Sequence, residues 1–257
     1  MSNQRRPYIL AETNWKSIRD TQFDIAILPW GATEAHNYHM PYATDNYQVD
    51  HVAYRSAEMA WDNGAKVIVL PTIPYGVNTG QLDIPFCMNM NPSTQLAILK
   101  DICEVLTRHG IEKLVVLNGH GGNNFISMIR ELAGLYPDLF ISTINWFKAA
   151  AKDDIFEKPG DHADEMETSV MMHLHPELLL PLSEAGNGET KRYQPIGFQE
   201  GWAWAQRPWT MVTNDTGSGD PSLSTAEKGS IFLDRCIHQI ASFFIETAGR
   251  PVASLIK

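Results

Sequence analysis

Residues 23–28 read Phe-Asp-Ile-Ala-Ile-Leu, and residues 29–41 continue as Pro-Trp-Gly-Ala-Thr-Glu-Ala-His-Asn-Tyr-His-Met-Pro. The first part is short, apolar and rich in β-branched residues, which predicts a buried strand. The second part carries one carboxylate, Glu34, and two imidazoles, His36 and His39. Carboxylates and imidazoles are common metal ligands, so this strand is predicted to lead directly into a chemically active loop.

Three further apolar runs recur along the chain, at 66–70, 113–117 and 140–145. Segments with apolar residues at helical spacing separate or follow them, at 46–62, 93–109, 125–135, 165–174 and 224–247, while 195–220 is predicted to be an irregular loop. Continuous apolar runs are typical of strands that helices cover on both faces. The order of strands and helices predicts an α/β fold with a parallel sheet, and no linker divides residues 1–257, so we expect a single domain.

Composition excludes several classes of function. The chain has 30 acidic and 20 basic residues, a formal net charge of -10, and no basic run longer than Arg5-Arg6. This balance argues against nucleic acid or an anionic membrane as the main partner. We find neither a signal segment nor a membrane-spanning stretch, and we expect a cytoplasmic protein. The scattered Cys87, Cys103 and Cys236 are expected to be free thiols.

Two clusters of polar residues are predicted to lie at the same edge of the sheet, because ligands of such sheets bind beyond the carboxyl ends of the strands. Glu34 and His36 follow the first strand, with Asp45 a short distance further on, and His120 follows the third within Asn118–Asn123. Carboxylate and imidazole donors without thiolate suit a hydrolytic Zn, Mn or Fe(II) site. A bridging aspartate with flanking Glu and His would suit two metals.

Each cluster also has a simpler interpretation. The residues after the first strand could form a solvated loop. The turn at 119–122 could bind a phosphate at a helix N-terminus, although no Lys-Ser/Thr pair follows it. The two clusters together favour the metal interpretation over either alternative.

His162 lies beside the predicted start of the helix at 165–174, among acidic residues. One interpretation is an ordinary capping segment. The other makes His162 the proton donor to a leaving amine, because imidazole titrates near neutral pH. Glu165 and Glu167 are two residues apart and cannot face the same way from a helix, so only one is expected to reach the site. Three nearby tryptophans form either a flap over the substrate or an oligomer contact: Trp202, Trp204 and Trp209.

Taken together, these motifs resemble those of the creatininase (creatinine amidohydrolase) family. Residues 28–41 followed by Asp45 are similar to its first motif, and 118–123 reproduce its second, Asn-Gly-His-Gly-Gly-Asn. Residues 162–169 are similar to its third motif. The Gly-Asp-Pro at 219–221 and the Glu-Lys-Gly at 227–229 match two later landmarks. The resemblance therefore extends from the first strand to the last helix.

This resemblance implies a creatininase-like fold around a four-stranded parallel sheet, a site for two divalent ions and a homo-oligomer, often a hexamer. The ions implied are Zn and/or Mn, with Fe as a further option. Matching positions imply four metal ligands, with the aspartate bridging: Glu34, His36, Asp45 and His120. Creatininases carry a glutamate at the position of Gly122, and we infer that Glu165 replaces it as fifth ligand, with Glu167 as the alternative. The same matching makes His162 the proton carrier and Trp146 a residue of the substrate pocket.

Departures from the family pattern concern the substrate. Gly122, and Lys158 in place of a second pocket tryptophan, argue against creatinine itself. Asn37 and Asp164 replace motif glycines, and the family's Phe-Pro-Gly-Thr stretch is altered around residues 84–88. The substrate is therefore expected to differ from creatinine while the bond type is shared.

The sequence thus predicts a metal-dependent amidohydrolase that acts on a C-N amide bond, cyclic or linear, in a small molecule. Two ions would hold a hydroxide for attack, His162 would protonate the departing nitrogen, and the backbone amides of Gly121 and Gly122 would assist the oxyanion. The alternative is a non-catalytic metal- or ligand-binding protein that retains the fold. Every expected ligand position has a candidate, which favours the enzyme.

Overall fold

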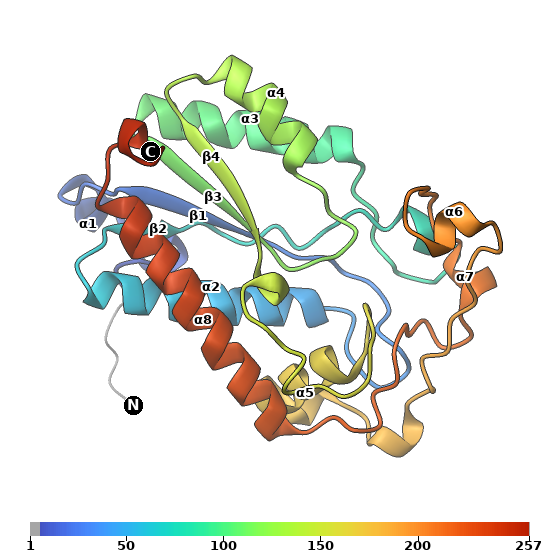
Figure 1. Ribbon diagram of the computed structural model, residues 1–257. Coiled ribbons are helices and arrows are strands. Elements are labelled where there is room, and N and C mark those ends of the chain that lie inside the picture. The colour runs from blue at the N-terminus through green and yellow to red at the C-terminus, as the bar shows by residue number, and fades with distance from the viewer. Residues whose placement is uncertain (1–5, 257) are drawn as a thin grey trace.

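The computed structural model describes residues 6–256, and its centre is a sheet of four parallel strands in the order β2-β1-β3-β4 (Figure 1). The predicted four-stranded parallel sheet is confirmed. Each strand lies within two residues of its predicted bounds, and the observed bounds are β1 (Ile25–Trp30), β2 (Val67–Val69), β3 (Lys113–Asn118) and β4 (Phe140–Asn145).

Helices cover both faces of the sheet, as the continuous apolar runs predicted (Figure 1). One face packs against α2 (Thr44–Asp62) and α8 (Ala226–Ala248), and α5 (Glu165–Leu174) packs in turn on α8. The other face packs against α3 (Pro92–Arg108) and α4 (Ile126–Leu135).

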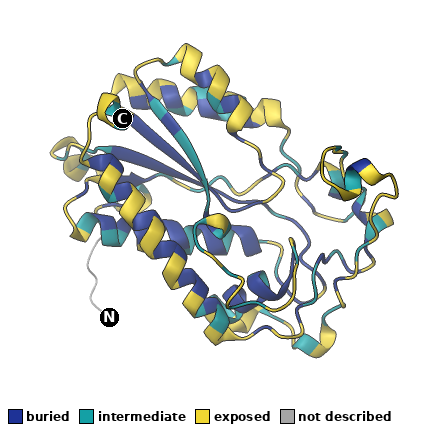
Figure 2. Cartoon of the chain, viewed as in Figure 1, coloured by how far each residue is buried: buried dark blue, intermediate teal, exposed yellow. Residues whose placement is uncertain are grey.

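Successive strand residues contribute to two separate cores. Ile25 and Ile27 of β1 join the core under α2 and α8, whereas Ala26 and Leu28 join the core under α3 and α4. Figure 2 shows β1, β2 and β3 as buried along their length, whereas most of the edge strand β4 is only half-buried. A strand buried on both faces requires apolar residues at consecutive positions, which explains why the runs do not alternate.

The remaining elements are short. They include α1 (Trp15–Arg19), and α6 (Ile196–Gln199) and α7 (Trp209–Val212) lie within the segment predicted as an irregular loop. The 3-10 turns are η1 (Leu10–Glu12), η2 (Thr79–Gln81), η3 (Trp146–Lys148), η4 (Pro176–Leu178), η5 (Leu182–Glu184) and η6 (Val252–Ser254). No helix within residues 6–256 is both long and apolar enough to cross a membrane.

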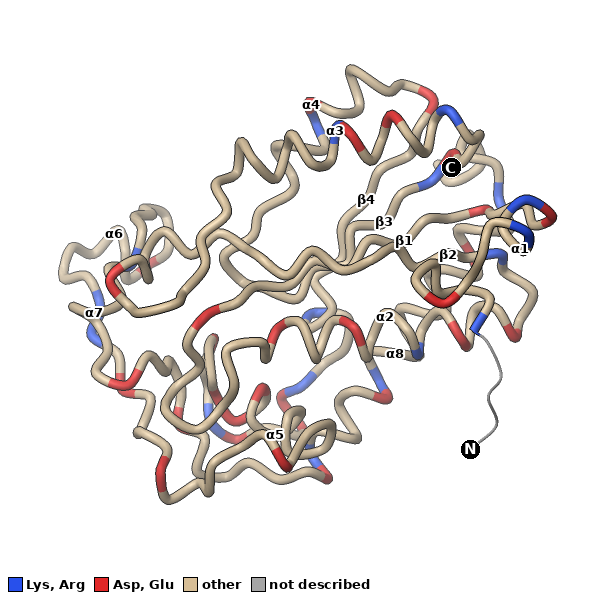
Figure 3. The backbone as a smooth tube through the Cα atoms, turned by 180° about the vertical axis from the view of Figure 1, so that it is seen from behind, with Lys and Arg blue, Asp and Glu red and all other residues tan. Residues whose placement is uncertain are grey.

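Lys113 is the one charged residue in the four strands, which are otherwise tan in Figure 3. Its side chain is buried, and its Nζ donates hydrogen bonds to the carbonyls of Ala248, at 3.2 Å, and Arg250, at 2.7 Å. A lysine at this position satisfies carbonyls that the end of α8 leaves without partners, so it fastens the last long helix to the sheet.

The strand register brings two functional loops side by side. Trp30, the last residue of β1, pairs with Asn118, the last residue of β3, and Gly119 N donates to Trp30 O at 2.8 Å. The strand order reverses between β1 and β3, and such a switch point is where open α/β sheets bind ligands. The loops that carry Glu34 and His120 therefore leave the sheet together.

We predict that Phe232→Ala lowers the free energy of unfolding by about 3–5 kcal/mol. Phe232 is fully buried on α8, with its ring centroid 5.9 Å from that of Trp146 and 5.4 Å from that of Phe156. Ile231→Ala is the matched control on the same helix: Ile231 is 42% exposed, and we expect a change of about 0.5 kcal/mol or less. Urea unfolding followed by circular dichroism measures both, and equal effects would contradict this placement of the core.

Candidate active site

Asp45 lies at the centre of a buried cluster of acidic and imidazole groups. It stands in the first turn of α2, and its Oδ1 lies 3.1 Å from His36 Nε2 while its Oδ2 lies 3.0 Å from His120 Nδ1. One carboxylate thus contacts two imidazoles that come from the loops after β1 and β3.

Two glutamates flank this arrangement, one on each side. Glu34 Oε1 lies 2.8 Å from His120 Nδ1, and Glu167 Oε2 lies 3.9 Å from His36 Nε2. Three overlapping groups result, and in each the ligand atoms lie within 4.8 Å of one another: Glu34, Asp45 and His120; His36, Asp45 and Glu167; and Glu34, His36 and His162. Asp45 belongs to the first two groups, as a ligand shared by two ions would.

Two oxygens of the cluster lack hydrogen bonds. Glu34 Oε1 and Asp45 Oδ2 are fully buried, yet within residues 6–256 neither accepts a hydrogen bond of normal geometry, although His120 Nδ1 lies close to both. Buried carboxylate oxygens without donors are costly unless a cation balances them. The donor set of carboxylates and imidazoles suits divalent Zn, Mn or Fe. These residues therefore fit a metal centre.

Gly119 allows the His120 loop to approach α2. A Cβ at this position would lie 2.8 Å from Val49 Cβ and 3.0 Å from Asp45 O, closer than side chains pack. The absence of a side chain at residue 119 thus brings His120 within reach of Asp45.

Gln81 and Cys87 orient Glu34. The Gln81 side-chain amide donates a hydrogen bond to Glu34 Oε2, while its Oε1 accepts one from Cys87 Sγ at 3.2 Å. Ala35 N donates to the same sulfur at 3.2 Å. Because the Cys87 thiol donates to Gln81 Oε1, the amide nitrogen of Gln81 faces Glu34 Oε2. The other carboxylate oxygen, Glu34 Oε1, is left directed at the cluster. The sequence carried no signal for this role, since it depends on how the turn at 79–81 meets the loop after β1.

His162 adjoins the cluster with a defined ring orientation. Its Nε2 lies 2.8 Å from Ala35 O, and its Nδ1 lies 3.7 Å from Glu34 Oε1. Its ring centroid lies 4.2 Å from that of His36 and 4.8 Å from that of Trp209. Burial, and then the neighbouring His36, lower the pKa of His162. The ring is therefore neutral near pH 7, with its proton on Nε2 and a free electron pair on Nδ1.

The structure corrects the expectation that Glu165 is the fifth ligand. Glu165 Oε1 accepts a hydrogen bond from Lys228 Nζ at 2.5 Å, and its Oε2 accepts from the backbone amides of Glu157, at 2.9 Å, and Lys158, at 2.7 Å. These contacts turn it away from the cluster. Glu167, the alternative two residues further along α5, has its carboxylate at the cluster, because residues two apart lie on different sides of a helix.

Residue 122, where creatininases carry a glutamate, has no space for a side chain in this structure. A Cβ there would lie 2.4 Å from His120 Nε2 and 2.4 Å from Val77 O, so no side chain fits at this position. His120 Nε2 donates instead to Val77 O at 3.1 Å. The space that a glutamate at 122 would need is occupied, and Glu167 faces the cluster from α5 instead.

Asn37 and Asp164, which stand at motif glycines, each have a structural reason. Asn37 adopts φ 53°, the left-handed region that asparagine tolerates better than most residues. Its Oδ1 accepts a hydrogen bond from Gly186 N at 2.8 Å. Asp164 caps α5 by accepting a hydrogen bond from Glu167 N at 3.0 Å, so it fixes the turn that presents Glu167.

A cavity of about 280 Å³ opens onto the cluster. Gly121 and Gly122 line it, as expected for a substrate site. Trp146 does not: it is fully buried in the core, next to Phe232, and the expectation that it lines the pocket is corrected. Trp204 and Trp209 line the cavity instead, because the segment between α6 and α7 folds over it.

The protonation state of the metal-free cluster follows from its geometry. Burial by itself would lower the pKa of His36, but Asp45, followed by Glu167 and Glu34, raises it to about 10. Glu34 and Asp45 likewise raise the pKa of His120 against the effect of burial. Burial raises the pKa of Glu167 to about 8. Near pH 7 these groups therefore hold protons that a bound cation would displace.

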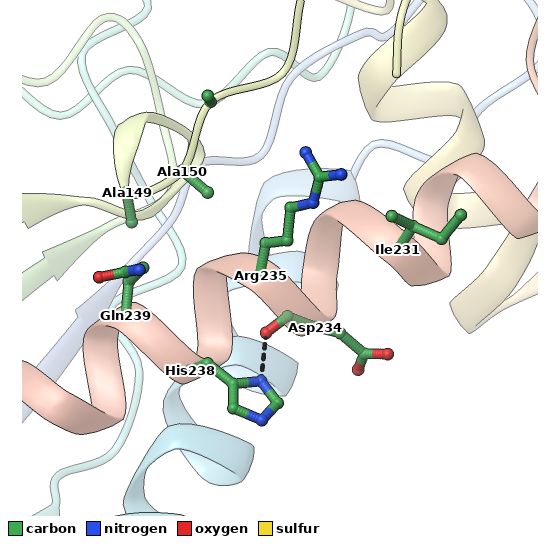
Figure 4. Close-up of a pocket in the computed structure, with 8 residues that line it drawn as sticks. Ala149, Ala150, Ile231, Asp234, Arg235, His238 and Gln239 are labelled. Carbon is green, nitrogen blue, oxygen red and sulfur yellow. Dashed lines mark hydrogen bonds between the residues drawn. The ribbon is translucent and has the colours of Figure 1, made fainter. Parts of the chain in front are cut away.

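A second hollow lies between α8 and the chain that follows η3, and is lined by Ala149, Ala150, Ile231, Arg235 and His238, among others (Figure 4). Arg235 donates two hydrogen bonds of 2.8 Å to Asp154, and His238 Nδ1 donates to the carbonyl of Asp234 at 2.7 Å. The metal-compatible groups found among residues 6–256 all lie at the other cavity. The cavity at the Asp45 cluster is therefore the one with candidate metal ligands.

Comparison with known proteins identifies the family of this chain. The creatininase family model, described as creatinine amidohydrolase, matches residues 11–244. The chain belongs to the creatininase family. It is 28% identical to the creatinine amidohydrolase of Pseudomonas putida over 84% of this chain and 87% of that protein. It is 25% identical to the mycofactocin precursor peptide peptidase of Mycobacterium ulcerans over 93% of this chain and 94% of that protein.

Solved structures show the same fold. A candidate creatinine amidohydrolase from Bacteroides fragilis NCTC 9343 has a TM-score of 0.90 and 42% identity, covering 97% of this chain and 99% of that chain. Creatininase structures at 22–23% identity, with TM-scores of 0.77–0.78, include a mutant in a Zn-Zn form and an Mn form. The creatininase-like fold is thus confirmed.

We predict that Glu167→Gln weakens divalent metal binding at least about tenfold. Glu165→Gln is the matched control on the same helix. It should leave metal binding unchanged and instead lower the free energy of unfolding by about 1–3 kcal/mol, because it removes the carboxylate that Lys228 contacts. Zinc titration calorimetry and urea unfolding measure the two effects. The opposite pattern, with metal binding lost only in Glu165→Gln, would support Glu165 as the fifth metal ligand.

We further predict that zinc binding at pH 7 releases roughly two to three protons per chain. His36 and His120 have raised pKa values and Glu167 has a pKa of about 8, so all three hold protons at pH 7, and metal affinity should fall as the pH is lowered. Calorimetry in buffers of different ionisation enthalpy counts the protons. His162→Gln is the control and should leave the count unchanged, because His162 is already neutral. Binding without proton release would contradict this picture.

Proposed function

We propose that this chain is a metal-dependent amidohydrolase that cleaves a C-N amide bond, cyclic or linear, in a small molecule. The observation that carries the proposal is the Asp45 carboxylate, held between His36 and His120 and flanked by Glu34 and Glu167. Membership of an amidohydrolase family supports the reaction class. The cavity of about 280 Å³ lies just below the ~300–1,000 Å³ usual for small-molecule sites, which supports a compact substrate.

Two divalent ions would share the cluster. Glu34, Asp45 and His120 would hold one, and His36, Asp45 and Glu167 the other. Zn and/or Mn are favoured by the Zn-Zn and Mn forms of related creatininases, and Fe also suits these ligands. When bound, such ions lower the pKa of water and polarise a carbonyl oxygen.

His162 would carry the proton. Ala35 O holds the Nε2 proton, so Nδ1 is the free nitrogen, and it faces the cluster beside Glu34. Nδ1 would take a proton from the attacking water and return it to the departing nitrogen, which is general base and then general acid catalysis. The backbone amides of Gly121 and Gly122, which line the cavity, would stabilise the oxyanion.

Creatinine is not the substrate we propose. Trp146 is buried outside the cavity, and Lys158 pairs with Asp220 at 3.3 Å. Neither residue contributes an aromatic wall like that of the creatinine pocket. The tryptophans that do line the cavity, Trp204 and Trp209, lie on a different segment, and this difference favours another amide.

A cytoplasmic location and a homo-oligomer remain predictions of the sequence. Exposed apolar side chains on the segment around α6 and α7 support self-association: Ile196, Trp202 and Met211. Size-exclusion chromatography with light scattering would measure the number of chains.

We predict that zinc- or manganese-loaded protein hydrolyses a member of a panel of small amides. Asp45→Ala should lose both metal binding and activity, because Asp45 contacts both imidazoles. His162→Gln should keep its metals and lower kcat by about 10²–10⁴. Asp50→Ala is the control on the same helix, since Asp50 bonds to Thr72 outside the cluster, and it should keep its metals.

Metal content and steady-state kinetics decide the outcome. Less than one ion per chain after reconstitution, or full metal retention in Asp45→Ala, would contradict the proposed site. Full metal binding with no hydrolysis of any amide in the panel would favour a non-catalytic binding protein.

A further inference from the structure

The segment between α6 and α7 forms one wall of the cavity, and this wall contains a positively charged side chain. Among the residues that line the cavity in the described part of the chain, Arg207 is the one Lys or Arg. Glu34, Asp45 and Glu167 line the same cavity, and Arg207 also borders an adjoining hollow. A ligand whose amide lies at the cluster therefore has a guanidinium within the same small cavity.

The Arg207 side chain is held in place on two sides. Its Cζ lies 4.7 Å from the centroid of the Trp209 ring, and its Nη1 lies 3.2 Å from Asp161 Oδ1 and 3.1 Å from Asp161 Oδ2. Its backbone is seated against Gly80, where a Cβ would lie 2.1 Å from Arg207 O. Stacking and ion pairing together orient the guanidinium before any ligand binds.

Part of the guanidinium remains available. Within residues 6–256 only Nη1 of Arg207 makes a hydrogen bond, so Nε and Nη2 have no protein acceptor. These two nitrogens form one edge of a planar fork, which matches the two oxygens of a carboxylate. The cavity contains a single guanidinium that Asp161 already contacts, so a group with one negative charge fits better than a doubly charged phosphate.

We propose that Arg207 binds a carboxylate of the substrate, so that the substrate is a small amide bearing a single negative charge. The amide part rests on the function proposed above. The carboxylate part rests on the guanidinium, its contacts with Trp209 and Asp161, and its place in the cavity. Arg207 is thus a specificity-determining residue.

The test compares a charged and a neutral probe that differ at one group. N-acetylglycine carries the carboxylate and N-acetylglycinamide replaces it with a neutral amide. Calorimetry on metal-free protein measures both affinities without turnover. We expect wild type to bind N-acetylglycine about tenfold more tightly, the scale of a charge-assisted hydrogen-bonded pair. Arg207→Gln should abolish this preference, and Arg207→Lys should keep part of it.

Arg192→Gln is the matched control, because Arg192 lines a neighbouring hollow but not this cavity, and it should bind as wild type does. Thermal melting verifies that each variant is folded. In the metal-loaded enzyme, the ratio of KM values for any hydrolysed acid and amide pair should change in Arg207→Gln while kcat changes little. Bound cations also attract carboxylates, so the difference between wild type and Arg207→Gln is the decisive quantity.

Equal binding of the two probes by wild type, or a preference that survives in Arg207→Gln, would overturn the proposal. Tighter binding of N-(phosphonomethyl)acetamide than of N-acetylglycine would overturn the single-charge assignment. If no amide is hydrolysed but the preference depends on Arg207, the proposed function fails while this binding site stands.

Discussion

The geometry of the candidate site depends on one buried carboxylate. Asp45 lies between His36 and His120, and taking such charged groups out of water is expensive unless each has a partner. Its position requires that two loops meet, which the pairing of Trp30 with Asn118 provides, and that α2 begins beside them. Because Gly119 has no side chain, the loop that carries His120 can pack directly against α2. Sheet register and helix placement together bring these groups close enough to share one carboxylate.

The acid beside His36 comes from α5 and not from the turn that contains residue 122. Residue 122 has no room for a side chain, yet the acid beside His36 is still present as Glu167 of α5. Asp164 caps that helix and so fixes the direction of Glu167. A metal centre constrains where the ligand atoms lie, and any element that places a carboxylate there satisfies it.

Much of the fold could be predicted from the sequence because it depends on apolar periodicity. The run at 140–145 became β4 within the same bounds, and the pattern at 165–174 became α5. Glu34, His36, Asp45 and His120 were expected to lie close together at the carboxyl ends of the strands, and the structure brings them together there. Contacts between distant segments could not be predicted: Gln81 reaches Glu34 from a separate turn, and Trp209 reaches His162 from the segment that folds over the cavity.

The sequence by itself determined the parallel sheet, the helices on both faces and the residue types available at the strand ends, because these depend on local spacing. Tertiary structure alone decided which residues face the cluster. Glu165 and Glu167 are equivalent as letters, but Lys228 and two backbone amides turn Glu165 away while Glu167 faces His36. Trp146 joined the core rather than the cavity for the same reason. The direction of a side chain is set by the partners packed around it, and those partners come from distant parts of the chain.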